Sequence, residues 1–238
     1  MIIVTDAHIS EAADNHTAFF RMLEAFEKTG HDLIFLGDIF DLWIAMPRYE
    51  KDIHARFSAW CRNQKPLRAI GFLEGNHEFY VADEKPETFT WCSKNAWRRD
   101  NTGVLFVHGD QINRKDKIYL GFRKLAKNKI AKFILRTLPC GPSLIGSFQL
   151  GLSRLNNKTR GYLPGEEIEK FAESGFAAGV DTIFVGHFHR EYRYRNSESK
   201  ELHVLPDWLS TQKITIYRQR PKQIKSIHWQ ELAAGGHL

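Results

Sequence analysis

The sequence has few cysteines, no long apolar run and, over one stretch, almost no acidic side chains. Its three cysteines, Cys61, Cys92 and Cys140, are far apart and odd in number. This excludes a disulfide framework and a paired-cysteine metal site, and it predicts a chain of the reducing cytoplasm. The longest uncharged run, residues 137–153, contains two prolines and three glycines, so we expect it not to cross a bilayer. No basic segment with a long apolar stretch precedes residues 2–4, so no secretory signal is expected.

The charge is distributed unevenly along the chain. The 34 Lys and Arg residues outnumber the 28 Asp and Glu residues, which gives a net charge of +6. Residues 114–160 hold twelve Lys and Arg against one acid, Asp116, and this local surplus of eleven leaves −5 for the rest. We therefore expect an acidic body carrying one basic module, the basic cap (residues 114–162), that meets an anionic partner.

The remaining composition is typical of a folded domain. Hydrophobic residues make up 42%, charged residues 26% and aromatic residues 13% of the 238 positions, which excludes disorder, collagen and coiled coil and suits a single domain, 1–238. Short apolar runs alternate with helical patterns, so we expect a layered α/β fold. The expected core strands are 2–4, 33–36, 70–73, 104–107 and 182–185, followed by 191–195, 202–205, 213–217 and 223–229 without helices between them. The expected helices are 17–28, 49–63 and 166–174, the last ended by Gly175.

The basic cap is expected to be an insertion between two core strands. Residues 117–136 carry apolar side chains at helical spacing, which predicts one amphipathic helix. Its apolar face would consist of Tyr119, Phe122, Ala126, Ile130 and Phe133. Gly141 and Pro142 interrupt this pattern. We expect a second amphipathic helix beyond them, with Leu144, Phe148, Leu152 and Leu155 aligned.

Each of the five core strands is followed at once by residue types that bind metal ions. The clusters are Asp6-Ala7-His8, Gly37-Asp38-Ile39-Phe40-Asp41, Gly75-Asn76-His77-Glu78, His108-Gly109-Asp110 and Gly186-His187-Phe188-His189. Because ligands of an open α/β sheet bind at the carboxyl ends of the strands, we expect these clusters to meet at one edge. Imidazole with carboxylate suits Mn, Fe, Co or Zn better than Ca or Mg, and seven or more ligands exceed the needs of one ion. The pattern predicts a pair of divalent metal ions that activate water for hydrolysis of a phosphoester or phosphoanhydride.

Three hypotheses from different classes remain open at this point. Any one cluster alone is more typical of a turn or a helix cap, but five clusters that each follow a strand favour a dimetal hydrolase. A hydrolase of nucleic acid or another phosphoester is the second hypothesis, and the basic cap fits a polyanion. Nucleic acid is less favoured, because the aromatic residues of the cap follow helical spacing, which is typical of packing. A binding scaffold without metals is the weakest hypothesis, since such a chain is expected to have lost several ligands.

These five blocks, in this order, resemble the calcineurin-like metallophosphoesterase superfamily from Asp6 to His189. The resemblance implies a four-layered α/β/β/α sandwich of two mixed sheets with an inserted helical cap. It also implies a first metal held by Asp6, His8, Asp38 and His189, and a second held by Asp38, Asn76, His108 and His187. Asp38 would bridge the two ions, which we expect to be Mn²⁺, with Fe, Zn or Co as alternatives.

The resemblance also implies roles for two further residues. His77 corresponds to the family's histidine near the leaving group, where it would donate a proton or a hydrogen bond to the phosphate. The alternative is that His77 only orients Asn76. Asp41 is expected to hold a ligand histidine in its tautomer, and its alternative is a simple turn cap.

Within the superfamily, the sequence is most similar to the UDP-2,3-diacylglucosamine diphosphatases of lipid A biosynthesis. The similarity rests on residues 37–44, on His108-Gly109-Asp110 with Asp116 and Tyr119 beyond it, and on Leu205-Pro206-Asp207-Trp208. It implies substrate contacts at Asn76, His77, Asp116, Tyr119, Ser153, Asn157, Arg160 and His187. Many of these diphosphatases carry Gly-Asn-Arg-Asp where this chain has Gly75-Asn76-His77-Glu78, the general superfamily form, so another phosphoester substrate stays open.

The implied reaction is attack of a metal-bridging hydroxide on the diphosphate of UDP-2,3-diacylglucosamine, which releases UMP and 2,3-diacylglucosamine 1-phosphate. The basic cap would bind the diphosphate, and an apolar groove would receive the acyl chains. The expected groove residues are Phe122, Ile130, Phe133, Leu144, Ile145 and Phe148. The remaining basic side chains would draw the protein to an anionic bilayer, as a peripheral protein on the cytoplasmic face of the inner membrane. The alternative is that the apolar stripe only packs the cap helices together. The sequence leaves the oligomeric state open.

Overall fold

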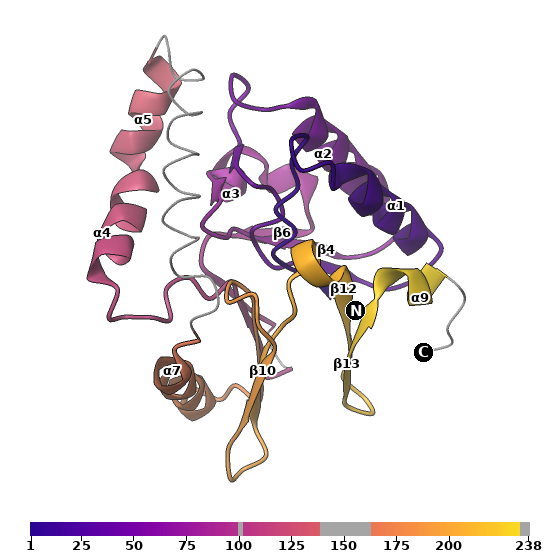
Figure 1. Ribbon diagram of the computed structural model, residues 1–238, viewed down its shortest axis with the longest axis vertical. Helices are drawn as coiled ribbons and strands as arrows, with labels where there is room; N and C mark the ends of the chain where they lie inside the picture. Colours follow the sequence, from indigo (N-terminus) through magenta and orange to yellow (C-terminus); the bar gives the residue numbers. More distant parts are fainter. Residues whose placement is uncertain (100–101, 139–162, 234–238) are drawn as a thin grey trace.

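The computed structural model describes residues 1–99, 102–138 and 163–233, in which helices and strands alternate along most of the chain (Figure 1). The strands are β1 (Ile2–Val4), β2 (Leu33–Phe35), β3 (Trp43–Ile44), β4 (Ile70–Leu73), β5 (Glu78–Phe79), β6 (Trp91–Ser93), β7 (Ala96–Arg99), β8 (Val104–Val107), β9 (Thr182–Val185), β10 (Tyr192–Arg195), β11 (Glu201–Val204), β12 (Lys213–Arg218) and β13 (Gln223–His228). The helices are α1 (His16–Glu27), α2 (Asp52–Gln64), α3 (Val81–Glu84), α4 (Lys117–Ala126), α5 (Lys129–Thr137), α7 (Gly165–Ala177), α8 (Trp208–Thr211) and α9 (Trp229–Ala233), with a 3₁₀ turn at Pro86–Thr88.

The described strands form two large mixed sheets and one small one. The six-stranded sheet has the order β13-β12-β1-β2-β4-β6, in which β1, β2, β4 and β6 are parallel and β12 and β13 antiparallel to their neighbours. The five-stranded sheet has the order β10-β11-β9-β8-β7, with a parallel centre and antiparallel edges. The small sheet pairs β3 with β5. The expected α/β class with mixed sheets is confirmed.

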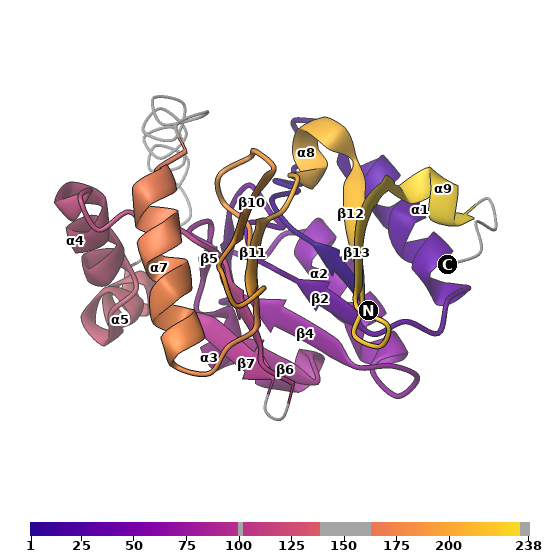
Figure 2. The ribbon, with the colours of Figure 1, turned by 90° about the horizontal axis from the view of Figure 1, so that it is seen from below.

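Side chains alternate between two apolar cores along the central strands. On β1, Ile2 and Val4 join the core beneath α1 and α2, whereas Ile3 joins a core shared with the other sheet. On β9, Ile183 packs toward α7, whereas Phe184 packs into that shared core. Strand side chains point alternately to opposite faces, so each central strand contributes to two cores. Figure 2 shows α7 beside the five-stranded sheet and α1 beside the six-stranded sheet.

The predicted core strands match β1, β2, β4, β8 and β9, with β2 one residue shorter than expected. Strands β3, β5, β6 and β7 were not predicted, because they are either only two residues long or, as in β6 and β7, not uniformly apolar runs. The C-terminal strands match β10 to β13 within one residue at each end, but α8 lies between β11 and β12 and α9 follows β13, so the expected absence of helices there is wrong. The prediction that Gly175 ends the third helix is wrong too, because α7 continues to Ala177. A Cβ at Gly175 would lie 2.8 Å from Cδ1 of Ile183, which explains this glycine by close packing.

The basic cap departs most from its prediction. The expected single helix over 117–136 is two helices, α4 and α5, because Asn128 begins a new helix by accepting a hydrogen bond from the backbone N–H of Ala131 at 2.7 Å. The break separates Ile130 and Phe133 from the apolar face of α4, and these two side chains are 71% and 66% exposed. In both views α4 and α5 lie on the opposite side of the molecule from α1 (Figures 1 and 2).

Part of the basic cap lies outside the described residues. This applies to the expected second amphipathic helix, with Leu144, Phe148, Leu152 and Leu155, and to Ile145, Ser153, Asn157 and Arg160. Among the helices that are described, none combines the length and apolar character needed to cross a membrane.

Candidate metal centre

The five clusters of polar residues meet at the carboxyl ends of the strands. Asp6 and His8 follow β1, Asp38 follows β2, Asn76 and His77 follow β4, His108 follows β8, and His187 and His189 follow β9. Potential ligand atoms lie within 4.8 Å of one another in three groups: Asp6, His8 and His189; His8, Asp38 and His77; and Asp38, His108 and His187. The three groups overlap, so they form one continuous cluster.

Asp38 lies at the centre of this cluster and is 2% exposed. Its Oδ2 is 3.3 Å from Nε2 of His108, 3.8 Å from Nε2 of His8 and 3.9 Å from Nε2 of His77. Its Oδ1 accepts a hydrogen bond of 2.9 Å from the backbone N–H of His77. One carboxylate oxygen is thus held by the backbone, while the other faces three imidazole nitrogens.

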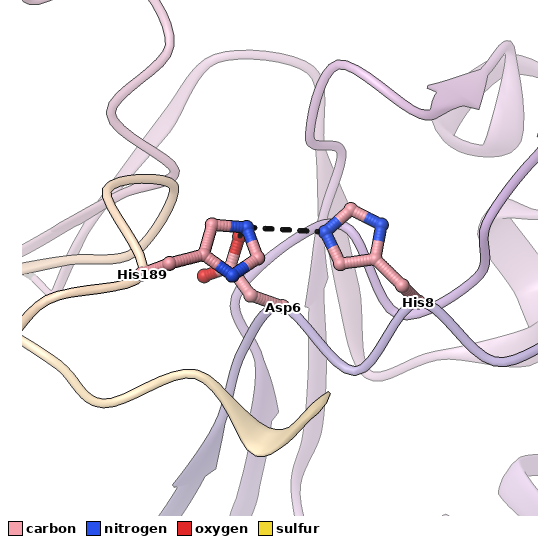
Figure 3. A group of neighbouring side chains, drawn as sticks. All are labelled: Asp6, His8 and His189. Carbon is pink, nitrogen blue, oxygen red and sulfur yellow. Dashed lines mark hydrogen bonds and ion pairs between the residues drawn. The ribbon is translucent and has the colours of Figure 1, made fainter. Parts of the chain in front are cut away.

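In the second carboxylate, Asp6, one oxygen accepts hydrogen bonds and the other has no hydrogen-bond partner among the described residues. Oδ2 accepts hydrogen bonds from the hydroxyl of Thr5 at 2.6 Å and from the backbone N–H of His187 at 2.8 Å. Oδ1 is buried, has no hydrogen-bond partner among the described residues and lies 3.6 Å from Nε2 of His189. The imidazoles of His8 and His189 point toward one another beside it, with their Nε2 atoms 3.3 Å apart (Figure 3). A shared cation would satisfy all three side chains.

His108 and Asn76 form the opposite end of the cluster. Nδ1 of His108 lies 3.0 Å from the carbonyl oxygen of Leu36, which only accepts, so Nδ1 carries a proton. Nε2 of His108 is left facing Oδ1 of Asn76 at 3.2 Å, as well as Asp38. Metal-binding histidines are oriented in this way, with one ring nitrogen donating to a carbonyl and the other free for the ion.

The electrostatics of the cluster favour a bound cation. Burial alone would lower the pKa of His108, but the carboxylate of Asp38 raises it to about 10. Burial and the charge of His108 lower the pKa of His187 to about 4. Burial opposes ionisation of Asp38, yet the surrounding histidines hold its pKa well below the usual value. The negative charge of Asp38 favours a proton on His108, and the same charge would attract a metal ion in place of that proton.

The backbone of the cluster is held in an unusual conformation. Positive φ angles occur at Asp6 (52°), His8 (42°), Asp38 (51°), His187 (70°) and His189 (50°). Non-glycine residues rarely adopt this region, and strain of this kind concentrates at functional sites. Gly37, with φ of 85°, shows how closely the segments pack, because a Cβ there would lie 2.4 Å from Nδ1 of His108.

Two buried carboxylates that support the cluster were not assigned roles from the sequence. Glu78 accepts backbone N–H bonds from Asp38, Ile39 and Phe40, and one from Gly75, at 2.7–3.2 Å. It therefore joins the segments that follow β2 and β4, and the signal was its place in the Gly75–Glu78 block.

Asp207 supports His189 from the opposite side of the ring. Its Oδ2 accepts from the backbone N–H and the hydroxyl of Ser210 and lies 3.7 Å from Nδ1 of His189. Although burial raises its pKa, the contacts with His189 and Ser210 lower it to about 2. The signal was the Leu205–Trp208 segment that the sequence analysis noted without assigning a role.

Three other predicted site residues make contacts within the protein. The backbone carbonyl of Asp41 accepts a hydrogen bond from Nδ1 of His77, which fixes that ring. The side chain of Asp116 accepts from the backbone N–H of Tyr119 at 2.9 Å and begins α4. The hydroxyl of Tyr119 donates to Oδ2 of Asp110 at 2.7 Å. The substrate roles of Asp116 and Tyr119 stay predictions, and so does the expected role of Asp41 in holding a ligand histidine in its tautomer.

The donor set fits divalent metal ions. It offers imidazole, carboxylate and amide ligand atoms, a central carboxylate with one oxygen turned to three histidines, and an orphaned buried oxygen on Asp6. Such a mixed set is typical of Mn, Fe, Co and Zn sites. Two mixed sheets with this donor set at their strand ends define an α/β protein built to hold metal ions.

Comparison with known proteins identifies the family. The sequence model of the calcineurin-like phosphoesterase family matches residues 1–191, so the chain belongs to this dimetal-dependent family. A "UDP-2,3-diacylglucosamine hydrolase" of Pseudomonas putida (strain F1) is 26% identical over 224 residues, covering 87% of this chain and 90% of the relative. The protein with the same name from Azotobacter vinelandii is 26% identical over 227 residues, with the same coverage. A predicted phosphoesterase structure from Streptococcus pneumoniae covers 96% of this chain and 88% of its own, with 9% identity and a TM-score of 0.43, which adds nothing to the assignment.

Proposed function

We propose that this protein hydrolyses the diphosphate of UDP-2,3-diacylglucosamine to UMP and 2,3-diacylglucosamine 1-phosphate with two bound divalent metal ions, which we take to be Mn²⁺. The observation that carries the proposal is the convergence of His8, His77 and His108 on Oδ2 of Asp38. Curated relatives that bear the name of this activity, at 26% identity over most of the chain, support the choice of substrate.

The residues of the chain divide the work between two ions and the phosphate. Asp6, His8 and His189 would hold one ion, Asn76, His108 and His187 would hold the other, and Asp38 would contact both. When bound, such a pair supplies Lewis acidity and lowers the pKa of a coordinated water.

His77 is suited to serve the leaving group. Its Nδ1 donates to the carbonyl of Asp41, so its Nε2 is the nitrogen turned toward Asp38 and the site. In the imidazolium form, Nε2 would donate a proton or a hydrogen bond to the phosphate oxygen that departs. The proton on Nδ1 stays in its hydrogen bond to the carbonyl of Asp41, which keeps the orientation of the ring fixed while Nε2 donates.

We further propose that α4 and α5 bring the protein to an anionic membrane surface, on the cytoplasmic face of the inner membrane. Ile118, Ile130 and Phe133 are 88%, 71% and 66% exposed on these helices. Exposed Lys117 and Lys129 lie beside them in the sequence. Apolar side chains flanked by basic residues suit the boundary between lipid head groups and acyl chains. Each basic residue near an anionic surface adds about 1 kcal/mol to the free energy of membrane binding.

The deciding experiment is product analysis with metal-replete protein, detergent and UDP-2,3-diacylglucosamine. We expect UMP and 2,3-diacylglucosamine 1-phosphate in equal amounts, and loss of both products on chelation. Absence of UMP, with both ions bound, would remove the substrate claim.

Another phosphoester is the second candidate, and it is favoured by His77, which stands where many of the diphosphatases carry Arg. A small chromogenic phosphodiester, single-stranded DNA and RNA belong in the same assay. Faster turnover of any of these than of the lipid nucleotide would favour the second candidate.

A further inference from the structure

Lys127, which directly follows α4, is a largely buried cation that faces the segment after β4. Its side chain is 11% exposed, and its Nζ donates a hydrogen bond to the carbonyl oxygen of Gly75 and lies 3.6 Å from Oε2 of Glu74. Burial lowers the pKa of Lys127, against the opposing effect of Glu74. Moving an ammonium group out of water is costly unless it is paired, so the placement of Lys127 depends on its contacts with Gly75 and Glu74. Lys124, one turn earlier and within α4, is exposed.

The peptide that Lys127 contacts lies against the central carboxylate. The backbone N–H of Gly75 donates to Oε2 of Glu78 at 2.8 Å, and the N–H of Asp38 donates to the same oxygen. A Cβ at Gly75 would lie 2.1 Å from Oδ1 of Asp38. The carbonyl of Gly75 and the nitrogen of Asn76 belong to one rigid peptide unit. Lys127 therefore fixes the direction in which the chain enters Asn76.

The same face of α4 also contacts the segment after β8. Tyr119 and Arg123 in α4 and Lys127 directly after it are spaced four residues apart, so they lie along one side of the helix and its end. The hydroxyl of Tyr119 and the guanidinium of Arg123 both contact Oδ2 of Asp110, which lies two residues beyond His108. One helix face thus holds the two segments that supply Asn76 and His108.

Building on the proposed function, we propose that Lys127 is a positioning residue for one of the two metal sites. By holding the carbonyl of Gly75, it keeps Oδ1 of Asn76 beside Nε2 of His108, a separation of 3.2 Å. Docking of α4 then sets the affinity of the site that uses Asn76 and His108. The site that uses Asp6, His8 and His189 has no ligand on either segment.

The test is Mn²⁺ titration of the full-length metal-free protein by calorimetry, with turnover of a small chromogenic phosphodiester as the second readout. We expect Lys127→Met to weaken the binding of one of the two ions about tenfold and to lower kcat about tenfold with KM unchanged. Loss of a contact that orients a metal ligand usually has an effect of this size. Lys127→Arg is expected to restore both values to within about threefold, because it keeps the cation and the donor. Lys124→Met, the matched exposed control, is expected to behave as the unchanged protein.

Two additional measurements separate positioning from other causes. The double variant Lys127→Met with Glu74→Gln removes both charges. We expect the same tenfold loss of metal affinity and kcat, which would show that an unpaired carboxylate at Glu74 does not cause the loss. In metal-free protein, hydrogen exchange of the 75–78 amides is expected to be about tenfold faster in Lys127→Met than in Lys124→Met.

If Lys127→Met weakened the binding of both ions equally, or changed KM alone, the positioning role would be overturned. Metal affinities in Lys127→Met that match those of Lys124→Met would overturn it too. If the unchanged protein binds two ions but releases no UMP from the lipid nucleotide, the proposed substrate fails, while the titration still decides the role of Lys127.

Discussion

The strand ends and the basic cap show two different relations between sequence and structure. At the strand ends, residues from the four other blocks come within a few ångströms of Asp38, because the parallel strands of two sheets, β1, β2 and β4 in one and β8 and β9 in the other, bring their carboxyl ends together. In the basic cap, the periodicity of residues 117–136 continued through Asn128, whereas the helix did not. Sheet topology is a constraint of the whole fold, and a helix boundary is decided by one local hydrogen bond.

The largest effect is expected when the charge at the centre of the strand ends is removed. We expect Asp38→Asn to lower turnover more than about a thousandfold, because the amide keeps the bond from the N–H of His77 but loses the charge that two cations share. Turnover and bound metal would be measured together. Asp181→Asn, at an exposed position directly before β9, serves as the control. Full metal content with wild-type turnover would show that Asp38 is not a bridge.

The second prediction separates metal binding from proton transfer within the same cluster. We expect His77→Gln to retain both ions and to lower turnover about a hundredfold, because the backbone N–H that contacts Asp38 is unchanged while the imidazole is lost. Elemental analysis and steady-state kinetics test this. Loss of metal, with the remaining turnover proportional to the metal left, would assign His77 to the ligand set instead.

His54 is a buried histidine that lies away from the strand ends. His54 is 1% exposed, stacks on Trp43 and accepts a hydrogen bond from the N–H of Lys51. Burial and the nearby charges of Lys51 and Lys85 lower its pKa to about 3. In the unfolded chain His54 takes up a proton near pH 6.5, but in the folded chain it does so only near pH 3, so the stability it contributes is lost as the pH falls between these values.

We therefore expect the unchanged protein to lose about 2 kcal/mol more unfolding free energy than His54→Phe when the pH is lowered from 6.5 to 5. Urea denaturation of the metal-free proteins at the two pH values measures this difference. His228→Phe, at the end of β13, is the matched control. Equal losses for the unchanged protein and His54→Phe would show that His54 is protonated in the folded state.

The smallest expected effect on stability is in the basic cap. Changing Ile130 and Phe133 to Ser is expected to alter the unfolding free energy by less than about 0.5 kcal/mol, because both side chains are exposed. Binding to vesicles of anionic phospholipid is expected to weaken about tenfold, since two apolar side chains would no longer be buried there. Leu67→Ser, 72% exposed and far from α5 in the sequence, is the control. An equal loss of binding for Leu67→Ser would contradict the proposed membrane surface.

The sequence predicted the site better than it predicted the details of the fold. Each core strand was an apolar run ended by a polar cluster, and these two signals together located β1, β2, β4, β8 and β9. Strands as short as β3 (Trp43–Ile44) and β5 (Glu78–Phe79) carry no such signal, because pairing between segments that are distant in the sequence decides whether two residues form a strand.

The supporting contacts of the site were harder to predict. Glu78 accepts hydrogen bonds from backbone groups, and Asp207 accepts them from Ser210 and lies against His189; such contacts depend on loop geometry that no spacing encodes. Asn15 illustrates the same difficulty. It stands directly before α1 and is a residue type that commonly caps helices, but its side chain bonds the N–H of Ser10 and the carbonyls of Ala7 and His8, and so it holds the segment after β1.

The most direct test of the account is anomalous diffraction from crystals of the protein soaked with Mn²⁺. Two ions per chain are predicted, one contacted by Asp6, His8 and His189, the other by Asn76, His108 and His187, with Asp38 touching both. A single ion, or ions bound away from Asp38, would contradict the central claim that the strand ends form a two-metal centre.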